Sequence, residues 1–178
     1  IQAYPTPFSD VGITLQQPCD VINLPGFAEG HVSVQDEAAQ LAAQLLAPRP
    51  GQRVLDACCA PGGKTGHILE LLNNQGDVIA IDIAAERLTR VTDNLLLSLL
   101  RALWPLLAEG GVLLYATCST LTQENDQVIA EFARDNHSVH VEPVATEAGM
   151  ATSTGRQLMP QIDGHDGFYF ARLVKTAI

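Results

Sequence analysis

The stretch of residues 54–70 limits what this chain can fold into more than any other part of it. An apolar run ends at Asp56, a loop rich in small residues follows, and apolar side chains then recur at helical spacing. This order predicts a strand at about 53–57, a loop, and a helix over about 64–72. A loop of this shape between a strand and a helix indicates a cofactor-binding site.

The segments that follow this loop indicate the fold class. Residues Asp77–Asp82 form an almost continuous apolar run, which is typical of a strand buried in a parallel sheet. A strand, a helix and a second strand within so few residues predict a βαβ unit. Two further strands are predicted at Val112–Thr117 and 167–174, so we expect an α/β fold.

The remaining segments are assigned from turn and capping signals. We expect residues 1–32 to form an irregular, turn-rich lead-in with one short strand, and residues 143–166 to form a long polar loop. A helix is predicted to begin near Ser33, because Ser33 and Asp36 approximate a capping box. The other predicted helices span about 84–95, 96–107 and 123–134.

Charge and cysteine usage limit the classes of protein. The formal net charge is −10 and the only lysines are Lys64 and Lys175, so a general nucleic-acid-binding surface is not indicated. The cysteines, at 19, 58, 59 and 118, lack the paired spacing of a zinc site or of a secreted disulfide framework. We therefore expect reduced thiols and a cytoplasmic protein. No apolar run reaches the roughly 20 residues of a membrane span, and no signal peptide is recognisable, so no membrane association is expected.

Three kinds of cofactor loop can be compared with residues 57–66. A P-loop requires its first glycine where Cys58 stands, and the glycines of this loop do not make the dinucleotide fingerprint. A nucleoside cofactor without a diphosphate needs fewer glycines, together with an acidic residue after the next strand to bind the ribose hydroxyls. Asp82 follows Gly62 by twenty residues, so S-adenosylmethionine fits best. The alternative is a purely structural turn.

Residues 56–65 resemble the first motif of the RNA 5-methylcytosine methyltransferase family. The further similar segments cover most of the chain: Pro25–Phe27 through Val34–Asp36, Asp82 with Arg87–Leu88, Tyr115–Ser119, Glu124–Asn125 and Asp166–Tyr169. The resemblance implies a Rossmann-like S-adenosylmethionine-dependent methyltransferase sheet with helices on both faces, mostly parallel with an antiparallel C-terminal strand. It also implies RNA as the partner, with small-subunit ribosomal RNA as the expected substrate.

The family's chemistry gives a role to Cys118. Carbon 5 of cytosine is a weak nucleophile, and addition of a thiolate to carbon 6 activates it. Cys118 matches the family's nucleophile and follows a predicted strand, at the sheet edge where ligands bind. The alternative role is that of a small buried apolar residue. The cofactor-binding residues that the resemblance implies are Cys58, Cys59, Ala60, Pro61, Gly62, Gly63, Lys64, Asp82 and Arg87.

The chain departs from the family at residues 94–98. The family carries there a second cysteine, in an Asp-Ala-Pro-Cys segment, and two strands of the sheet, all missing from this sequence. Two βα units correspond to about 60 residues, so we expect that the sequence omits an internal segment. Residues 33–178 would then form the catalytic domain, preceded by an RNA-binding domain. The alternatives are a non-catalytic scaffold that binds RNA, and a methyltransferase acting on a protein or a small molecule.

Overall fold

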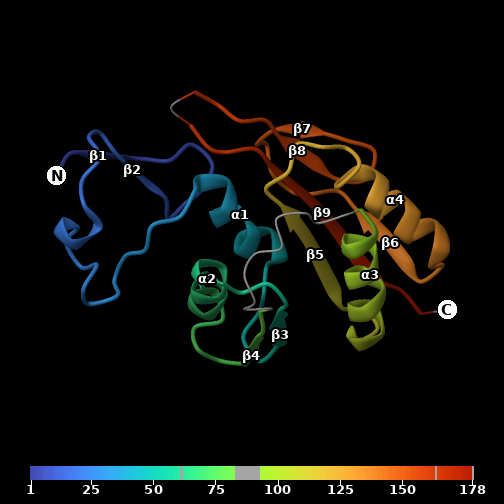
Figure 1. Ribbon diagram of the computed structural model, residues 1–178. Helices are drawn as coiled ribbons and strands as arrows, with labels where there is room; N and C mark the ends of the chain where they lie inside the picture. Colours follow the sequence, from blue (N-terminus) through green and yellow to red (C-terminus); the bar gives the residue numbers. More distant parts are fainter. Residues whose placement is uncertain (61, 83–92, 163, 178) are drawn as a thin grey trace. The chain divides into compact units, whose positions relative to one another are not determined.

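A computed structural model describes residues 1–60, 62–82, 93–162 and 164–177 (Figure 1). The chain divides into two compact units, Ile1–Ile83 and Ala84–Ile178. Within the described residues, no helix is both long enough and apolar enough to cross a membrane.

The first unit begins with a small antiparallel sheet of strands β1 (Ala3–Pro5) and β2 (Ile13–Leu15), followed by a short 3-10 helix, Val21–Asn23. The prediction of one short strand in this region was therefore wrong, because the strand has a partner. The connection between the two strands is attached to the following helix, since the backbone N–H groups of Phe8 and Ser9 donate to the Glu37 carboxylate at 2.6 and 3.1 Å.

Helix α1 spans Glu37–Leu46 and begins later than predicted. Its N-cap is Asp36, whose carboxylate accepts a hydrogen bond from the backbone N–H of Ala38 at 2.8 Å. Ser33 is not the cap, and residues 32–36 are non-helical. The helix ends at Leu46, and its C-cap is Ala47, a left-handed residue (φ 50°) that precedes Pro48.

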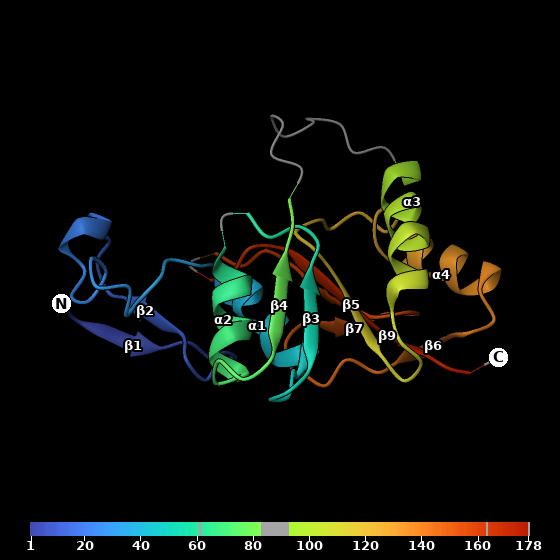
Figure 2. The same cartoon turned by 90° about the horizontal axis from the view of Figure 1, so that it is seen from below.

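The βαβ unit predicted from the sequence is present. Strand β3 (Arg53–Asp56) and strand β4 (Asp77–Ala80) are parallel neighbours, and helix α2 (Gly63–Leu71) connects them (Figure 2). Their small core contains residues from both helices and both strands, namely Ala43, Leu46, Val54, Ile68, Leu72 and Val78. Packing α1 and α2 on one face of the two strands fixes where the loop between β3 and α2 emerges.

The second unit is built on a five-stranded antiparallel sheet. Its elements in chain order are α3 (Asp93–Leu103), a 3-10 turn (Trp104–Leu106), β5 (Val112–Thr117), α4 (Asp126–Asp135), β6 (Val139–Glu142), β7 (Met150–Ala151), β8 (Arg156–Leu158) and β9 (Phe168–Lys175). The central strand is β9, which pairs with β5, β6 and β8, while β7 pairs with β8. The predicted antiparallel C-terminal strand is confirmed.

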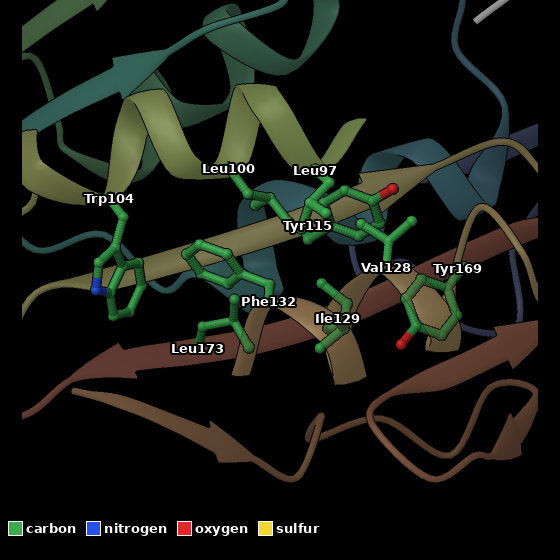
Figure 3. Packing of buried hydrophobic residues seen from close by; sticks show 10 residues of the cluster. Leu97, Leu100, Trp104, Tyr115, Val128, Ile129, Phe132, Tyr169 and Leu173 are labelled. Carbon is green, nitrogen blue, oxygen red and sulfur yellow. The ribbon is translucent and has the colours of Figure 1, made fainter. Parts of the chain in front are cut away.

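Both helices of the second unit pack on one face of this sheet. Side chains at alternate positions of β9 share one core with Leu97 and Leu100 of α3 and Phe132 of α4, and Leu173 lies beside Phe132 (Figure 3). The indole ring of Trp104 meets the ring of Phe132 edge to face, with centroids 5.4 Å apart. The other buried members of this core are Tyr115, Val128, Ile129, Tyr169, Ala171 and Leu173.

Two predictions in the second unit were wrong, and a third cannot be compared with the structure. The segment 143–166 is not one loop, because it contains the hairpin of β7 and β8, and β6 was not predicted at all. Helix α4 begins at Asp126 rather than at residue 123, because Asn125 has non-helical dihedral angles. The helix predicted over 84–95 lies mostly outside the described residues.

The β7–β8 hairpin is held to α4 by Asp126. One carboxylate oxygen of Asp126 accepts hydrogen bonds from the hydroxyls of Thr152, Ser153 and Thr154 and from the backbone N–H of Thr154, at 2.5–3.1 Å. Burial raises the pKa of Asp126, but these hydrogen bonds outweigh burial and hold the pKa below its ordinary value of 3.8. The ionised form is therefore the one that the fold stabilises.

We expect the substitution Asp126→Asn to lower the free energy of unfolding at neutral pH by about 1–3 kcal/mol, because three residues lose a charged acceptor. Since the folded pKa lies below the unfolded one, this contribution is complete above about pH 4 and is lost as the pH falls through the folded pKa. Urea unfolding of both proteins at about pH 7 and about pH 3 measures the difference. A difference that stays constant with pH would contradict this account.

Candidate cofactor-binding and catalytic site

The loop between β3 and α2 is fixed at its start by Asp56. One oxygen of this carboxylate accepts from the backbone N–H of Cys58 at 3.3 Å, and the other accepts from the hydroxyl of Thr65 at 2.7 Å. The loop ends at Gly62, which has a φ of 101° as the residue that precedes α2. A side chain would strain this position, so the glycine is required by the backbone.

Asp82, which follows β4, holds the other side of the loop. Its carboxylate accepts a hydrogen bond from the backbone N–H of Ala60 at 2.7 Å. Beside this contact, the N–H of Cys59 donates to the carbonyl of Ile81 at 3.1 Å. The structure thus brings Asp82 to the loop with which the sequence paired it, and the carboxylate retains acceptor capacity for further donors.

An open pocket lies against this loop. It is lined by Val34, Gln35, Cys58, Cys59, Ala60, Gly63 and Lys64. Five of these residues belong to the predicted cofactor set, whereas Val34 and Gln35 do not. They precede α1, and the side chain of Gln35 comes within 3.4 Å of where a β-carbon on Gly63 would stand. The similarity of Val34–Asp36 to the family is the sequence signal that could have identified them.

Two members of the predicted set, Pro61 and Arg87, lie outside the described residues. The others combine donors and acceptors suited to a nucleoside with a charged amino-acid part. Asp82 can accept from ribose hydroxyls, and the Lys64 ammonium can pair with a carboxylate. The residues present therefore fit S-adenosylmethionine. No group of three or more potential metal ligands occurs among the residues that the structure describes.

Cys58 is unsuited to act as a nucleophile. Partial burial raises the pKa of its thiol, and the negative charges of Asp82 and Asp56 raise it further, while Lys64 opposes them. These surroundings therefore disfavour the thiolate, which is the reactive form of a cysteine. This favours the prediction that Cys58 lines the cofactor site without reacting.

Cys118 lies in the second unit, directly after the last residue of β5, and its side chain is exposed. The residues on both sides of it are hydrogen-bonded. The hydroxyl of Thr117 donates to the side-chain oxygen of Asn125 at 2.6 Å, and the carbonyl of Ser119 accepts from the amide of Asn125 at 3.0 Å. An accessible thiol on an anchored loop is a suitable arrangement for attack on a substrate.

We expect Asp82→Ala to weaken S-adenosylmethionine binding by about 10–100-fold, because a hydrogen bond to a charged group contributes about 1.5–3 kcal/mol. Isothermal titration calorimetry measures the change in Kd. Asp77→Ala is the matched control, because Asp77 is an exposed carboxylate at the opposite end of β4 that pairs with Arg53. Equal losses in the two variants would argue against a direct contact of Asp82 with the cofactor.

The βαβ unit and the pocket-lining loop that follows its first strand are typical of the Rossmann-like fold of S-adenosylmethionine-dependent methyltransferases. A methyltransferase homolog from Pyrococcus horikoshii has this fold with a TM-score of 0.81 at 22% identity, covering 98% of this chain and 78% of its own. The structure of NSun6 from Pyrococcus horikoshii with SFG is similar with a TM-score of 0.75 at 22% identity. The similar region covers 90% of this chain and 57% of the NSun6 chain. The predicted Rossmann-like α/β fold is confirmed, although β3 and β4 are the one parallel pair among the described strands and the other pairings are antiparallel.

The family follows from sequence comparison. The family described as 16S rRNA methyltransferase RsmB/F matches residues 43–97 and 95–174, and this chain belongs to it. Ribosomal RNA small subunit methyltransferase B of Pseudomonas putida is 44% identical over 96% of the chain, and that of Erwinia tasmaniensis is 36% identical over 98%. The chain spans about half the length of these relatives, 53% and 54%. The predicted family is confirmed.

The comparisons also reveal an internal difference in length. The alignment with the Pseudomonas putida protein runs over 232 positions, 54 more than the 178 residues of the chain. At least that many positions of the relative therefore have no counterpart here. The family match is broken into two parts that meet at residues 95–97, within the range where the sequence predicts an omitted segment.

Proposed function

We propose that this chain is the catalytic part of an enzyme that methylates carbon 5 of a cytosine in RNA, with small-subunit ribosomal RNA as its substrate and S-adenosylmethionine as its methyl donor. The observation that carries the proposal is the exposed Cys118 on an anchored loop at the end of β5, in a chain of the RsmB/F family. The names of the curated relatives support ribosomal RNA as the substrate.

The proposed reaction uses the Cys118 thiolate as its nucleophile. The sulfur forms a bond to carbon 6 of cytosine, and the electron pair of the 5,6 double bond moves to carbon 5. S-adenosylmethionine held by Asp82 and Lys64 would supply the electrophilic methyl group for carbon 5, and its sulfur would keep the electron pair of the broken bond. A base then removes the carbon 5 proton, the double bond re-forms, and the sulfur of Cys118 leaves carbon 6.

This chemistry can be tested by trapping. In RNA that contains 5-fluorocytosine there is no proton on carbon 5 to remove, so the protein should stay covalently bound after methyl transfer. We expect a species on denaturing gels that contains RNA and protein, requires S-adenosylmethionine, and maps to Cys118 by mass spectrometry. The Cys19→Ser variant is the control, because Cys19 is an exposed cysteine that belongs neither to the pocket nor to the loop that carries Cys118. Methyl transfer to this RNA without a covalent species would contradict the mechanism.

The absence of the Asp-Ala-Pro-Cys segment favours a second candidate, a non-catalytic scaffold that binds RNA. Such a protein would bind 16S ribosomal RNA with no methyl transfer and no trapped species, even when the missing segment is supplied. A methyltransferase acting on a protein or a small molecule would instead transfer methyl groups to those substrates and leave RNA unmodified. The trapping experiment therefore separates the three functions.

We also propose that the functional protein carries an additional segment at residues 94–98. The first unit supports this, because Leu55, Ile79 and Ile81 are 40%, 50% and 49% exposed. Leu55 and Ile79 are partners in the register of β3 and β4, so they lie on one face of the sheet, opposite the face that packs on α1 and α2. Doubly wound sheets bury both faces, and an additional βα segment would cover this one.

Peptide mapping of the protein isolated from its source tests the segment directly. Trypsin cleaves after Arg90 and Arg101, so an uninterrupted chain yields the peptide Val91–Arg101. We expect this peptide to be absent and to be replaced by peptides of the intervening segment. Detection of Val91–Arg101 by mass spectrometry would overturn the proposal.

A further inference from the structure

The loop that carries Cys118 is held by two buried amide side chains. Asn125, at the start of α4, is 1% exposed, and Gln157, on β8, is 8% exposed. The Asn125 amide donates to the side-chain oxygen of Gln157 at 2.8 Å. Residues 32 positions apart in the sequence are thereby joined directly beneath the loop.

The two amides hold the chain on both sides of Cys118. The Asn125 side chain accepts from the hydroxyl of Thr117 and donates to the carbonyl of Ser119. That same carbonyl accepts a second hydrogen bond, from the Gln157 amide, at 3.2 Å. The residues before and after the cysteine are therefore fixed by side chains, although the cysteine itself is exposed.

Gln157 connects this arrangement to the centre of the sheet. Its amide nitrogen also lies 3.0 Å from the carbonyl of Phe168 on β9 and 3.1 Å from the carbonyl of Leu158. The amide has two N–H groups for the three carbonyls of Ser119, Leu158 and Phe168, and displacing it would break the hydrogen bonds that these groups share. The position of the Cys118 loop is thus tied to the rigid strands β8 and β9.

We propose that Asn125 and Gln157 are positioning residues that fix the Cys118 thiol for attack on the base. This inference rests on the proposed function, since it assumes that Cys118 is the nucleophile. Neither amide reacts, and they act through the side chain of Thr117 and the backbone carbonyl of Ser119. We call the hydrogen bonds of Asn125 and Gln157 to Thr117 and Ser119 the amide clamp. Misplacement of a reacting group by about 1 Å can cost on the order of 100-fold in rate, so loss of the amide clamp should lower kcat.

Gln157→Leu and Arg156→Ala form a matched pair for testing this. Arg156 is the neighbour of Gln157 on β8 and also donates to backbone carbonyls, those of Glu147, Ala148 and Gly149, but it does not bond the Cys118 loop. We expect Gln157→Leu to lower kcat for methyl transfer to 16S ribosomal RNA by about 10–100-fold with little change in KM for S-adenosylmethionine. Arg156→Ala should keep kcat within about twofold.

Hydrogen exchange gives a readout that does not depend on activity. The backbone amides of residues 119–121 should exchange faster in Gln157→Leu than in Arg156→Ala. An unchanged kcat in Gln157→Leu, or an equal loss of kcat in both variants, would overturn the proposed positioning role of the two amides. If Gln157→Leu does not fold, Thr117→Val removes the hydroxyl that donates to Asn125 and accepts from the backbone N–H of Ser119, and it should lower kcat in the same way.

The outcome for Cys118→Ser separates the two proposals. If Cys118→Ser remains active, the proposed function fails, whereas the exchange measurement still reports on the amide clamp. If Cys118→Ser is inactive and Gln157→Leu retains full kcat, only the proposed positioning role of Asn125 and Gln157 is rejected.

Discussion

Replacing Cys118 by serine is expected to reduce methyl transfer to RNA to the background level, both in the 178-residue chain and in the chain completed with the additional segment. A serine hydroxyl has nearly the same size but is far less acidic than a thiol, so almost no anion is available to add to carbon 6. The side chain of residue 118 is exposed, so the fold should be unaffected. Tritium transfer from labelled S-adenosylmethionine to 16S ribosomal RNA measures the loss.

Cofactor affinity is the internal control for this variant. The residues that line the pocket do not include Cys118, so Cys118→Ser should leave the Kd for S-adenosylmethionine unchanged. Cys19→Ser should retain full activity. Methyl transfer by Cys118→Ser at the rate of the unchanged protein would assign the nucleophile elsewhere. Cys58 would be an unsuitable replacement, because burial and two neighbouring carboxylates raise its pKa.

The parts of the fold that the sequence predicts well are those determined by neighbouring residues. The strand, loop and helix around Asp56 and the strand Val112–Thr117 lie within one residue of their predicted bounds. Periodicity and turn residues act over a few positions, so one sequence suffices to read them. The pairing of Asp82 with the loop was predicted because the spacing of strand ends in a βαβ unit is nearly fixed.

The missed features depend on contacts between distant segments. The β7–β8 hairpin is short and largely polar, and its place is set by hydrogen bonds to Asp126, more than 20 residues away. Gln157 carries no local signal either, because its role comes from meeting Asn125 across the unit. The late start of α4 has the same origin, since the side chain of Asn125 bonds the Cys118 loop. Tertiary contacts therefore determined each of these features.

Inserting the additional segment should raise both the free energy of unfolding and the rate of methyl transfer. We expect that a chain carrying the corresponding segment of the Pseudomonas putida protein between residues 95 and 97 unfolds with a free energy about 2–4 kcal/mol higher, because the exposed face of Leu55, Ile79 and Ile81 becomes covered. Methyl transfer to RNA should rise by about 100-fold or more, because supplying a missing part of a catalytic site restores the geometry of attack. Urea unfolding and tritium transfer measure the two effects.

A flexible linker of the same length at the same position is the matched control. Glycine and serine residues cannot cover an apolar face, so this insertion should neither stabilise the chain nor raise its activity. If both insertions have the same effect, the exposed face on β3 and β4 is not the binding surface of the segment. If only the relative's segment stabilises the chain, then the half-exposed side chains of Leu55, Ile79 and Ile81 are a consequence of the omission rather than a property of the family's sheet.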